Sequence, residues 1–135
     1  MCGAQALIDY IKTSARSLIY STGLPPSAVA ASIAALAVMQ KDSERCKKPL
    51  RHAQHFTSLL GMEAAGSAIV PVILKEADKA LAASALLEEK GFLVSAIRPP
   101  TVPEHMARLR FAFSALHEDA QVEAVAKIIK GQGWA

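Results

Sequence analysis

The spacing of apolar residues changes near the middle of the chain, and this change restricts the possible folds most. Up to about residue 60, apolar side chains recur every three or four positions, which is the period of an amphipathic helix. From residue 68 onward, short β-branched or strictly alternating segments are interleaved with helical ones. The sequence therefore predicts an α+β fold, with a helical N-terminal half followed by a β-α-β-β-α unit.

Three helices are expected in the N-terminal half. The first covers residues 4–19 and ends before Gly23 and the two prolines that follow it, because these residues break helices. The second begins near Ser27, and a charged stretch then leads to the third helix over residues 50–60. Gly61 is typical of the residue that closes a helix at its C-terminus.

Three strands are expected in the C-terminal half. Residues 68–74 are rich in β-branched side chains, and Pro71 predicts an edge strand or a bulge because proline donates no hydrogen bond. Residues 92–97 form the second predicted strand. Residues 108–113 alternate strictly, so that one face of this third strand points into the core. The residues expected on that face are Leu109, Phe111 and Phe113.

Two helices accompany these strands, over residues 77–90 and 118–130, and in the first of them the leucines are expected to be buried. Those leucines are Leu81, Leu86 and Leu87. We expect both helices to cover one face of a small, mainly antiparallel sheet. The expected domain division is a helical segment over residues 1–62 and a small α+β domain over residues 63–135.

The composition excludes several kinds of partner. The 135 residues are 52% hydrophobic, which suits a folded domain, and the formal charge is +3 from 15 basic and 12 acidic residues. Because basic and acidic residues are interleaved, we expect no nucleic-acid partner. No run of 18 apolar residues is present, so we expect no membrane partner. Cys2 and Cys46 lie outside any CxxC spacing, and no signal peptide is visible, which favours a cytoplasmic location without disulfides.

Arg98 is the strongest candidate for a binding residue. It follows the second predicted strand and lies in a loop that three prolines stiffen, Pro99, Pro100 and Pro103. A planar guanidinium on a rigid loop suits bidentate binding of a carboxylate, and Thr101 adds a hydroxyl nearby. The alternative is an ordinary surface arginine on a proline-rich turn.

Other polar groups are weaker candidates. Arg108 and Arg110 point to the same side of a strand and form either a basic strip or ion pairs with neighbouring carboxylates. Ser21 and Thr22 beside a glycine suit either a phosphate contact or an ordinary capping turn. No nucleophile, general base or complete metal-ligand set is evident.

The stretch Ile-Arg-Pro-Pro-Thr-Val-Pro at residues 97–103 is the most specific motif of the chain. Together with residues 15–26, 67–74, 107–110 and 114–117, it resembles the C-terminal part of the α-oxoamine synthases, and within that family the 8-amino-7-oxononanoate synthases. The resemblance extends through nearly all of the chain. These enzymes are pyridoxal-phosphate enzymes of fold type I.

The resemblance implies a decarboxylative condensation of pimeloyl thioester with L-alanine on pyridoxal 5'-phosphate, in biotin biosynthesis. Arg98 would hold the carboxylate of the amino acid, and Thr101 would contact the substrate. Ser21 and Thr22 would contact the phosphate of the cofactor across the interface of a homodimer. The resemblance also implies the C-terminal small domain of a fold type I enzyme.

Two departures from the family qualify this expectation. The lysine that forms the Schiff base lies in a Gly-Lys motif before the region where this chain begins, and the first lysine here is Lys12. We therefore expect no catalytic residue in this chain and no activity from it alone. Glu104 and His105 also stand where the family commonly has a small residue and glycine. The alternative function is a non-catalytic module that binds a small carboxylate or a partner protein.

Overall fold

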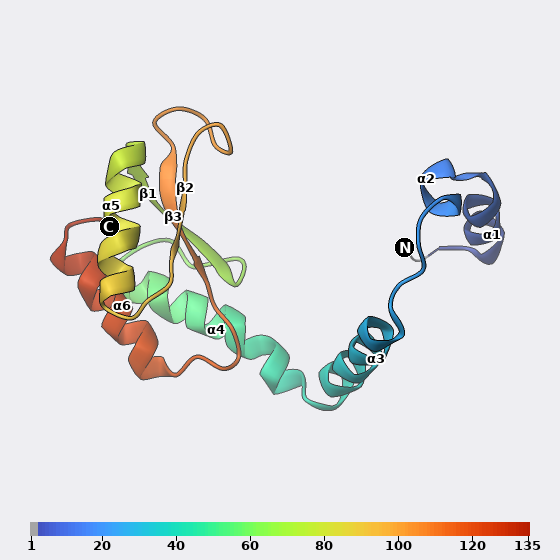
Figure 1. Cartoon of the computed structure of the whole chain (residues 1–135). Helices are drawn as coiled ribbons and strands as arrows, with labels where there is room; N and C mark the ends of the chain where they lie inside the picture. The colour runs from blue at the N-terminus through green and yellow to red at the C-terminus, as the bar shows by residue number, and fades with distance from the viewer. Residues whose placement is uncertain (1–2) are drawn as a thin grey trace. The chain divides into compact units, whose positions relative to one another are not determined.

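The structure, a computed structural model, describes residues 3–135, which divide after Lys41 into two units (Figure 1). Cys2 lies outside the described residues, so the expectation about the two cysteines stays a prediction. The second unit begins at Asp42 and therefore includes residues 50–60, which the sequence placed with the N-terminal helices. The division after residue 62 remains an expectation about the domains of a whole enzyme.

The first unit consists of helices α1 (Gln5–Ser14), α2 (Arg16–Ile19) and α3 (Pro26–Lys41). The single helix predicted over residues 4–19 was wrong, because the backbone is extended at Ala15 (φ −80°, ψ 104°). The Thr13 hydroxyl donates to the carbonyls of Asp9 (3.1 Å) and Tyr10 (3.0 Å), and such side-chain bonds compete with helix continuation. None of the three helices contains a buried residue.

Helix α4 (Ser43–Leu60) opens the second unit and begins earlier than predicted. The Asp42 carboxylate accepts a hydrogen bond from the backbone N–H of Arg45 (2.9 Å), which caps the helix and lowers the pKa of Asp42. This cap lets the helix start before Pro49, which the sequence treated as a boundary. The predicted C-terminal cap is confirmed, because Gly61 has φ 70° and Met62 N donates to the Thr57 carbonyl (2.9 Å).

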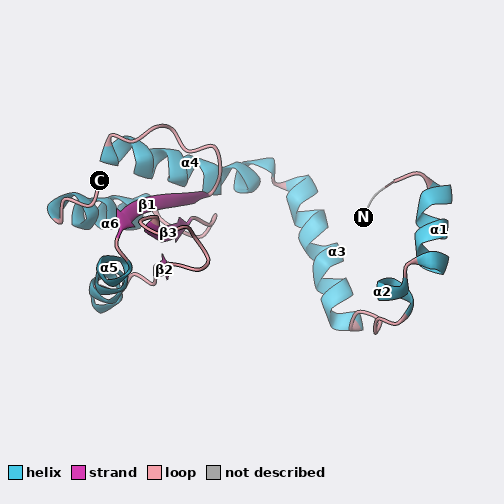
Figure 2. Ribbon diagram, turned by 90° about the horizontal axis from the view of Figure 1, so that it is seen from above, coloured by secondary structure: helices cyan, strands magenta, loops and turns pink. Residues whose placement is uncertain are grey.

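Strands β1 (Ile69–Lys75), β2 (Ser95–Ile97) and β3 (Ala107–Ala112) form an antiparallel sheet in the order β1-β3-β2. Figure 2 shows this order, with α4 beside β1. The edge position predicted for Pro71 is confirmed, since β1 pairs with β3 alone in the described sheet. The second strand is shorter than predicted. Phe92 N donates to the Leu87 carbonyl, and the Ser84 hydroxyl donates to the Val94 carbonyl, so this segment bonds to the helix instead of to β3.

Helices α5 (Ala77–Glu89) and α6 (Asp119–Gly131) complete the unit, and with α4 they cover one face of the sheet. The predicted α+β fold, with helices on one face of an antiparallel sheet, is confirmed. Alternate residues of β1 and β3 are buried there, among them Leu109 and Phe111 as predicted. Leu81 is 43% exposed, contrary to the prediction, because α5 turns a different face to the sheet. The buried residues of that face are Ala80, Ala83 and Leu87.

No helix within residues 3–135 is long and apolar enough to cross a lipid bilayer.

Candidate functional site

The loop between β2 and β3 holds Arg98, and local hydrogen bonds define its shape. Arg98 directly follows the last residue of β2 and is exposed. The Thr101 backbone N–H donates to the Arg98 carbonyl (3.1 Å), which closes a four-residue turn around a cis peptide bond between Pro99 and Pro100. The Arg98 guanidinium takes part in no hydrogen bond or ion pair with the residues that the structure describes. Its donors are therefore available to a ligand.

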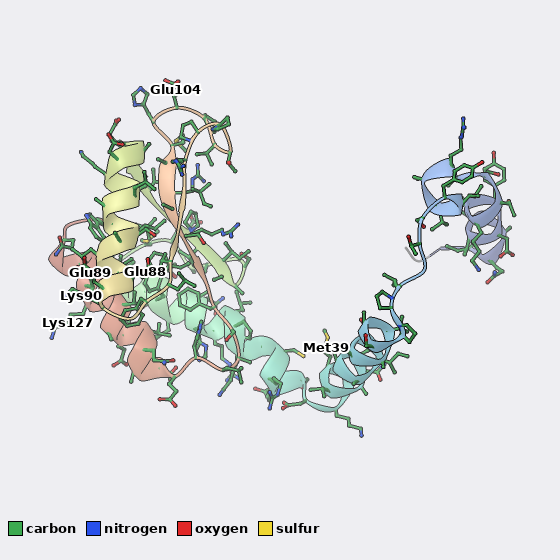
Figure 3. All side chains as sticks on the ribbon, in the orientation of Figure 1. Met39, Glu88, Glu89, Lys90, Glu104 and Lys127 are labelled. Atoms are coloured by element: carbon green, nitrogen blue, oxygen red, sulfur yellow. The ribbon has the colours of Figure 1, made fainter. Side chains whose placement is uncertain are left out.

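The second half of this loop is a separate turn. Met106 N donates to the Pro103 carbonyl (3.2 Å), and His105 between them has a left-handed backbone with φ 59°. Figure 3 labels Glu104 at the tip of the loop. Thr101 is exposed, and its hydroxyl has no hydrogen-bond partner within residues 3–135. Arg98 and Thr101 thus present a guanidinium and a hydroxyl at the two ends of one tight turn.

Arg108 and Arg110 lie on the face of β3 that the helices leave uncovered. Arg108 Nε donates to the Met106 carbonyl (2.9 Å), at the end of the Arg98 loop. The sequence left open whether these arginines form a basic strip or ion pairs with carboxylates. Neither arginine forms an ion pair among the described side chains. The residues of β1 that pair with them are apolar and exposed: Ile73, 43% exposed, pairs with Arg108, and Pro71 pairs with Arg110. This face of the sheet is therefore apolar with two cationic groups along its middle strand.

Ser21 and Thr22 lie in the first unit, in the exposed connection between α2 and α3. The Ser21 hydroxyl donates to the Leu18 carbonyl (2.7 Å), as in an ordinary capping turn. The Thr22 hydroxyl and the backbone N–H groups of Thr22 and Gly23 have no partner in the part of the chain that the structure describes. These free donors, with no acidic residue between Asp9 and Asp42, suit a phosphate group.

A second polar cluster, which the sequence did not predict, connects α4 to α6. His52 is buried, with Nδ1 3.0 Å from the Ser114 carbonyl and Nε2 3.5 Å from Asp119 Oδ1. His55 Nε2 lies 3.4 Å from Glu123 Oε1. No group of three metal-ligating side chains within residues 3–135 is arranged to hold a metal ion. This cluster therefore joins two helices of the core and is separate from the Arg98 loop.

A cavity of about 270 Å³ lies between β3, residues 91–94 and α6. Residues 92–94 were predicted to belong to β2, which begins only at Ser95. Its walls are mostly apolar and include Phe111 and Val125, with His117 among the polar groups. No residue of the loop over residues 98–106 lines it. The candidate site is therefore the exposed Arg98 loop rather than this cavity.

Comparison with known proteins identifies the family that this chain resembles. A family model described as aminotransferase class I and II matches residues 1–129. The putative 8-amino-7-oxononanoate synthase of Parvibaculum lavamentivorans is 53% identical over 130 residues, which are 96% of this chain and 33% of that protein. The 8-amino-7-oxononanoate synthase of Methylobacterium nodulans is 50% identical over 135 residues, which are 100% of this chain and 36% of that protein. The chain thus spans about a third of the length of these relatives.

Solved structures show the same fold. Serine palmitoyltransferase of Sphingomonas wittichii superposes with a TM-score of 0.85 at 27% identity, over 96% of this chain and 34% of that chain. The 8-amino-7-oxononanoate synthase of Francisella tularensis superposes with a TM-score of 0.77 at 24% identity, over 98% of this chain and 41% of that chain. The match of the family model over nearly the whole sequence establishes that the chain belongs to the aminotransferase class I and II family.

Proposed function

We propose that the chain is the C-terminal part of an 8-amino-7-oxononanoate synthase, which condenses pimeloyl thioester with L-alanine in biotin biosynthesis. The observation that carries this proposal is the Arg98 turn, with its guanidinium free of partners within residues 3–135. Relatives of that name are 50% and 53% identical to the chain, which supports the same function.

The chain's own residues would bind and orient the substrate. Arg98 would hold the carboxylate of L-alanine through two parallel N–H donors, and the turn would keep the guanidinium in place before the substrate arrives. The Thr101 hydroxyl would form a hydrogen bond with the same substrate, as donor or as acceptor. The Thr22 hydroxyl and the backbone N–H groups of Thr22 and Gly23 would hold the phosphate of pyridoxal 5'-phosphate, and the Ser21 hydroxyl would join them by giving up its bond to the Leu18 carbonyl. When bound, that cofactor supplies an electron sink for the carbanion chemistry of the condensation.

The cofactor's lysine would come from outside this chain. Lys12 is exposed on the surface of α1 and lacks the Gly-Lys context of the family. We therefore propose that the chain alone does not catalyse the condensation, and that the complete enzyme is a cytoplasmic homodimer. The test is to add pyridoxal 5'-phosphate, L-alanine and pimeloyl thioester to the isolated chain and to measure thiol release. Turnover by the isolated chain would contradict this part of the proposal.

A chimera tests the role of Arg98 directly. This chain would replace the matching third of the Methylobacterium nodulans relative, which it matches over all 135 residues. Arg98→Ala is expected to raise the KM for L-alanine by about tenfold to a hundredfold, because a charge-assisted hydrogen bond contributes about 1.5–3 kcal/mol. Arg51→Ala, at an exposed arginine of α4 paired with Glu44, is the matched control and is expected to leave the KM unchanged. An Arg98→Ala chimera with the original KM would refute the assignment.

The alternative function, a module that binds a small carboxylate without catalysis, is favoured by the same exposed guanidinium. It predicts that the isolated chain binds L-alanine or pimelate through Arg98. The test is a titration of the ¹⁵N-labelled chain with each carboxylate, with Arg98→Ala as the control. If the isolated chain binds neither molecule while the chimera is active, this alternative is wrong.

A further inference from the structure

Two residues with left-handed backbones lie at one end of the sheet, and one of them belongs to the Arg98 loop. Lys75 has φ 70° and His105 has φ 59°, and they are the non-glycine residues with positive φ within residues 3–135. Lys75 pairs with Ala107, two residues after His105, and the register of β1 shifts just before Lys75. Left-handed conformations are uncommon outside glycine, asparagine, aspartate and histidine. Histidine thus adopts this conformation more readily than lysine does, and Lys75 is the less common of the two cases.

A side-chain contact joins the same two turns. His105 Nδ1 lies 3.2 Å from Glu76 Oε1, and Glu76 directly precedes α5. The other hydrogen bonds of residues 98–106 stay within the loop or reach Arg108 at the start of β3. Among the described residues, the Glu76–His105 pair is thus the one hydrogen bond or ion pair that ties this loop to β1 and α5.

We propose that His105 and Glu76 form a latch that positions the Arg98 loop for its ligand. The two ends of the loop are anchored where Arg98 leaves β2 and where Ala107 begins β3, and the latch adds a third anchor at His105, two residues before β3. Three prolines between Arg98 and His105 restrict the backbone, so holding His105 in place narrows the positions available to the Arg98 guanidinium. Both residues are positioning residues, since neither one is placed against the substrate.

The latch acts before the substrate binds. A loop that is already ordered loses less conformational freedom on binding, so the affinity for the ligand rises. This effect rests on the proposed function of Arg98 as the residue that holds the amino-acid carboxylate. It predicts a change in the KM for L-alanine with little change in kcat, because the latch touches no reacting atom. The pair is partly exposed, with side chains 75% and 53% exposed, so the effect is modest.

The first test uses the isolated chain and needs no activity. Amide hydrogen exchange is measured by NMR at Thr101 and Met106, whose N–H groups close the two turns of the loop. Glu76→Ala, which removes the oxygen that meets His105, is expected to speed exchange at both amides about twofold to fivefold. Glu104→Ala removes an exposed carboxylate from the same loop without breaking the pair and is the matched control. Unchanged exchange in Glu76→Ala would overturn the latch.

The second test uses the chimera in which this chain replaces the matching third of the relative. Glu76→Ala and His105→Gly, the latter keeping the left-handed backbone without the imidazole, are each expected to raise the KM for L-alanine about twofold to fivefold at constant kcat. The double variant should show no further rise, since both changes break one contact. A KM unchanged by both single variants would overturn the latch even if Arg98→Ala has its full effect. A KM unchanged by Arg98→Ala refutes the proposed function instead, and the exchange result still decides whether the latch orders the loop.

Discussion

Phe56 is the side chain whose removal most directly tests how the second unit is held together. It lies on α4 and is fully buried, with 0% of its surface exposed. Its ring centroid is 4.8 Å from that of Phe111 and 5.3 Å from that of Phe113, so one side chain joins α4 to β3 and to the residue that follows β3. Replacing Phe56 by alanine removes both ring contacts and leaves a cavity between helix and sheet.

The size of the effect follows from this environment. Burying a phenylalanine side chain contributes about 1.5–3 kcal/mol, and each aromatic pair adds about 0.5–1.5 kcal/mol. The cavity lies between a helix and a sheet, which cannot close on it fully, so we expect Phe56→Ala to lower the free energy of unfolding by about 3–5 kcal/mol. A unit of this length is stabilised by about 5–14 kcal/mol in total. Phe56→Leu, which keeps most of the volume, is expected to cost less than about 1.5 kcal/mol.

Urea unfolding of the full chain, followed by tryptophan fluorescence, measures this difference. Trp134 is the one tryptophan in the sequence, and it packs against the core of the second unit, so its emission reports on that unit. Ser58→Ala, at an exposed position of the same helix, is the control and should change the stability by less than about 0.5 kcal/mol. A loss of less than about 1 kcal/mol in Phe56→Ala would refute the packing of α4 on β3.

The cap of α4, the exposed face of α3 and the buried face of α5 each give a testable expectation. The backbone N–H of Arg45 lowers the pKa of Asp42, so the stability that this cap adds is present above the ordinary pKa of about 3.8 and is lost as the pH falls through the lower folded value. Circular dichroism should therefore show a loss of helix in strong acid, and this pH dependence should be smaller in Asp42→Asn. Because Ile33 on α3 is 65% exposed among other exposed apolar residues, the isolated chain should self-associate in sedimentation, and Ile33→Lys should weaken the association; a compact monomer at high concentration would contradict this. In urea unfolding, Ala83→Leu should cost about 1–3 kcal/mol because α5 buries that position, whereas Leu81→Ala should cost less than about 1 kcal/mol, and equal losses would argue against the observed face of α5.

Much of the local structure could be predicted from the sequence because its causes are local. Strict alternation predicted β3 and the burial of Leu109 and Phe111, since successive side chains of a strand point to opposite faces. Gly61 predicted the end of α4, because glycine adopts the left-handed conformation at low cost. Pro71 predicted an edge strand, because it has no N–H to donate.

Where the prediction failed, the deciding contacts came from elsewhere. The early start of α4 depends on the carboxylate of Asp42, which outweighs the boundary signal of Pro49 seven residues later. The short β2 results from bonds of residues 92 and 94 to α5. On α5 itself, the periodicity allowed more than one buried face, and the sheet selected the face with small alanines, which leaves Leu81 exposed.

The candidate site divides in the same way. The position of Arg98 in a proline-stiffened loop after a strand could be predicted from the residues alone, because proline restricts the backbone wherever it occurs. The folded chain was needed to show that Arg108 and Arg110 lack acidic partners among the described side chains, and that His105 meets Glu76. Those two residues are 29 positions apart, and they meet because β1 and β3 pair antiparallel and bring the turns at one end of the sheet together. Such a contact depends on strand register, which no local pattern of residues specifies.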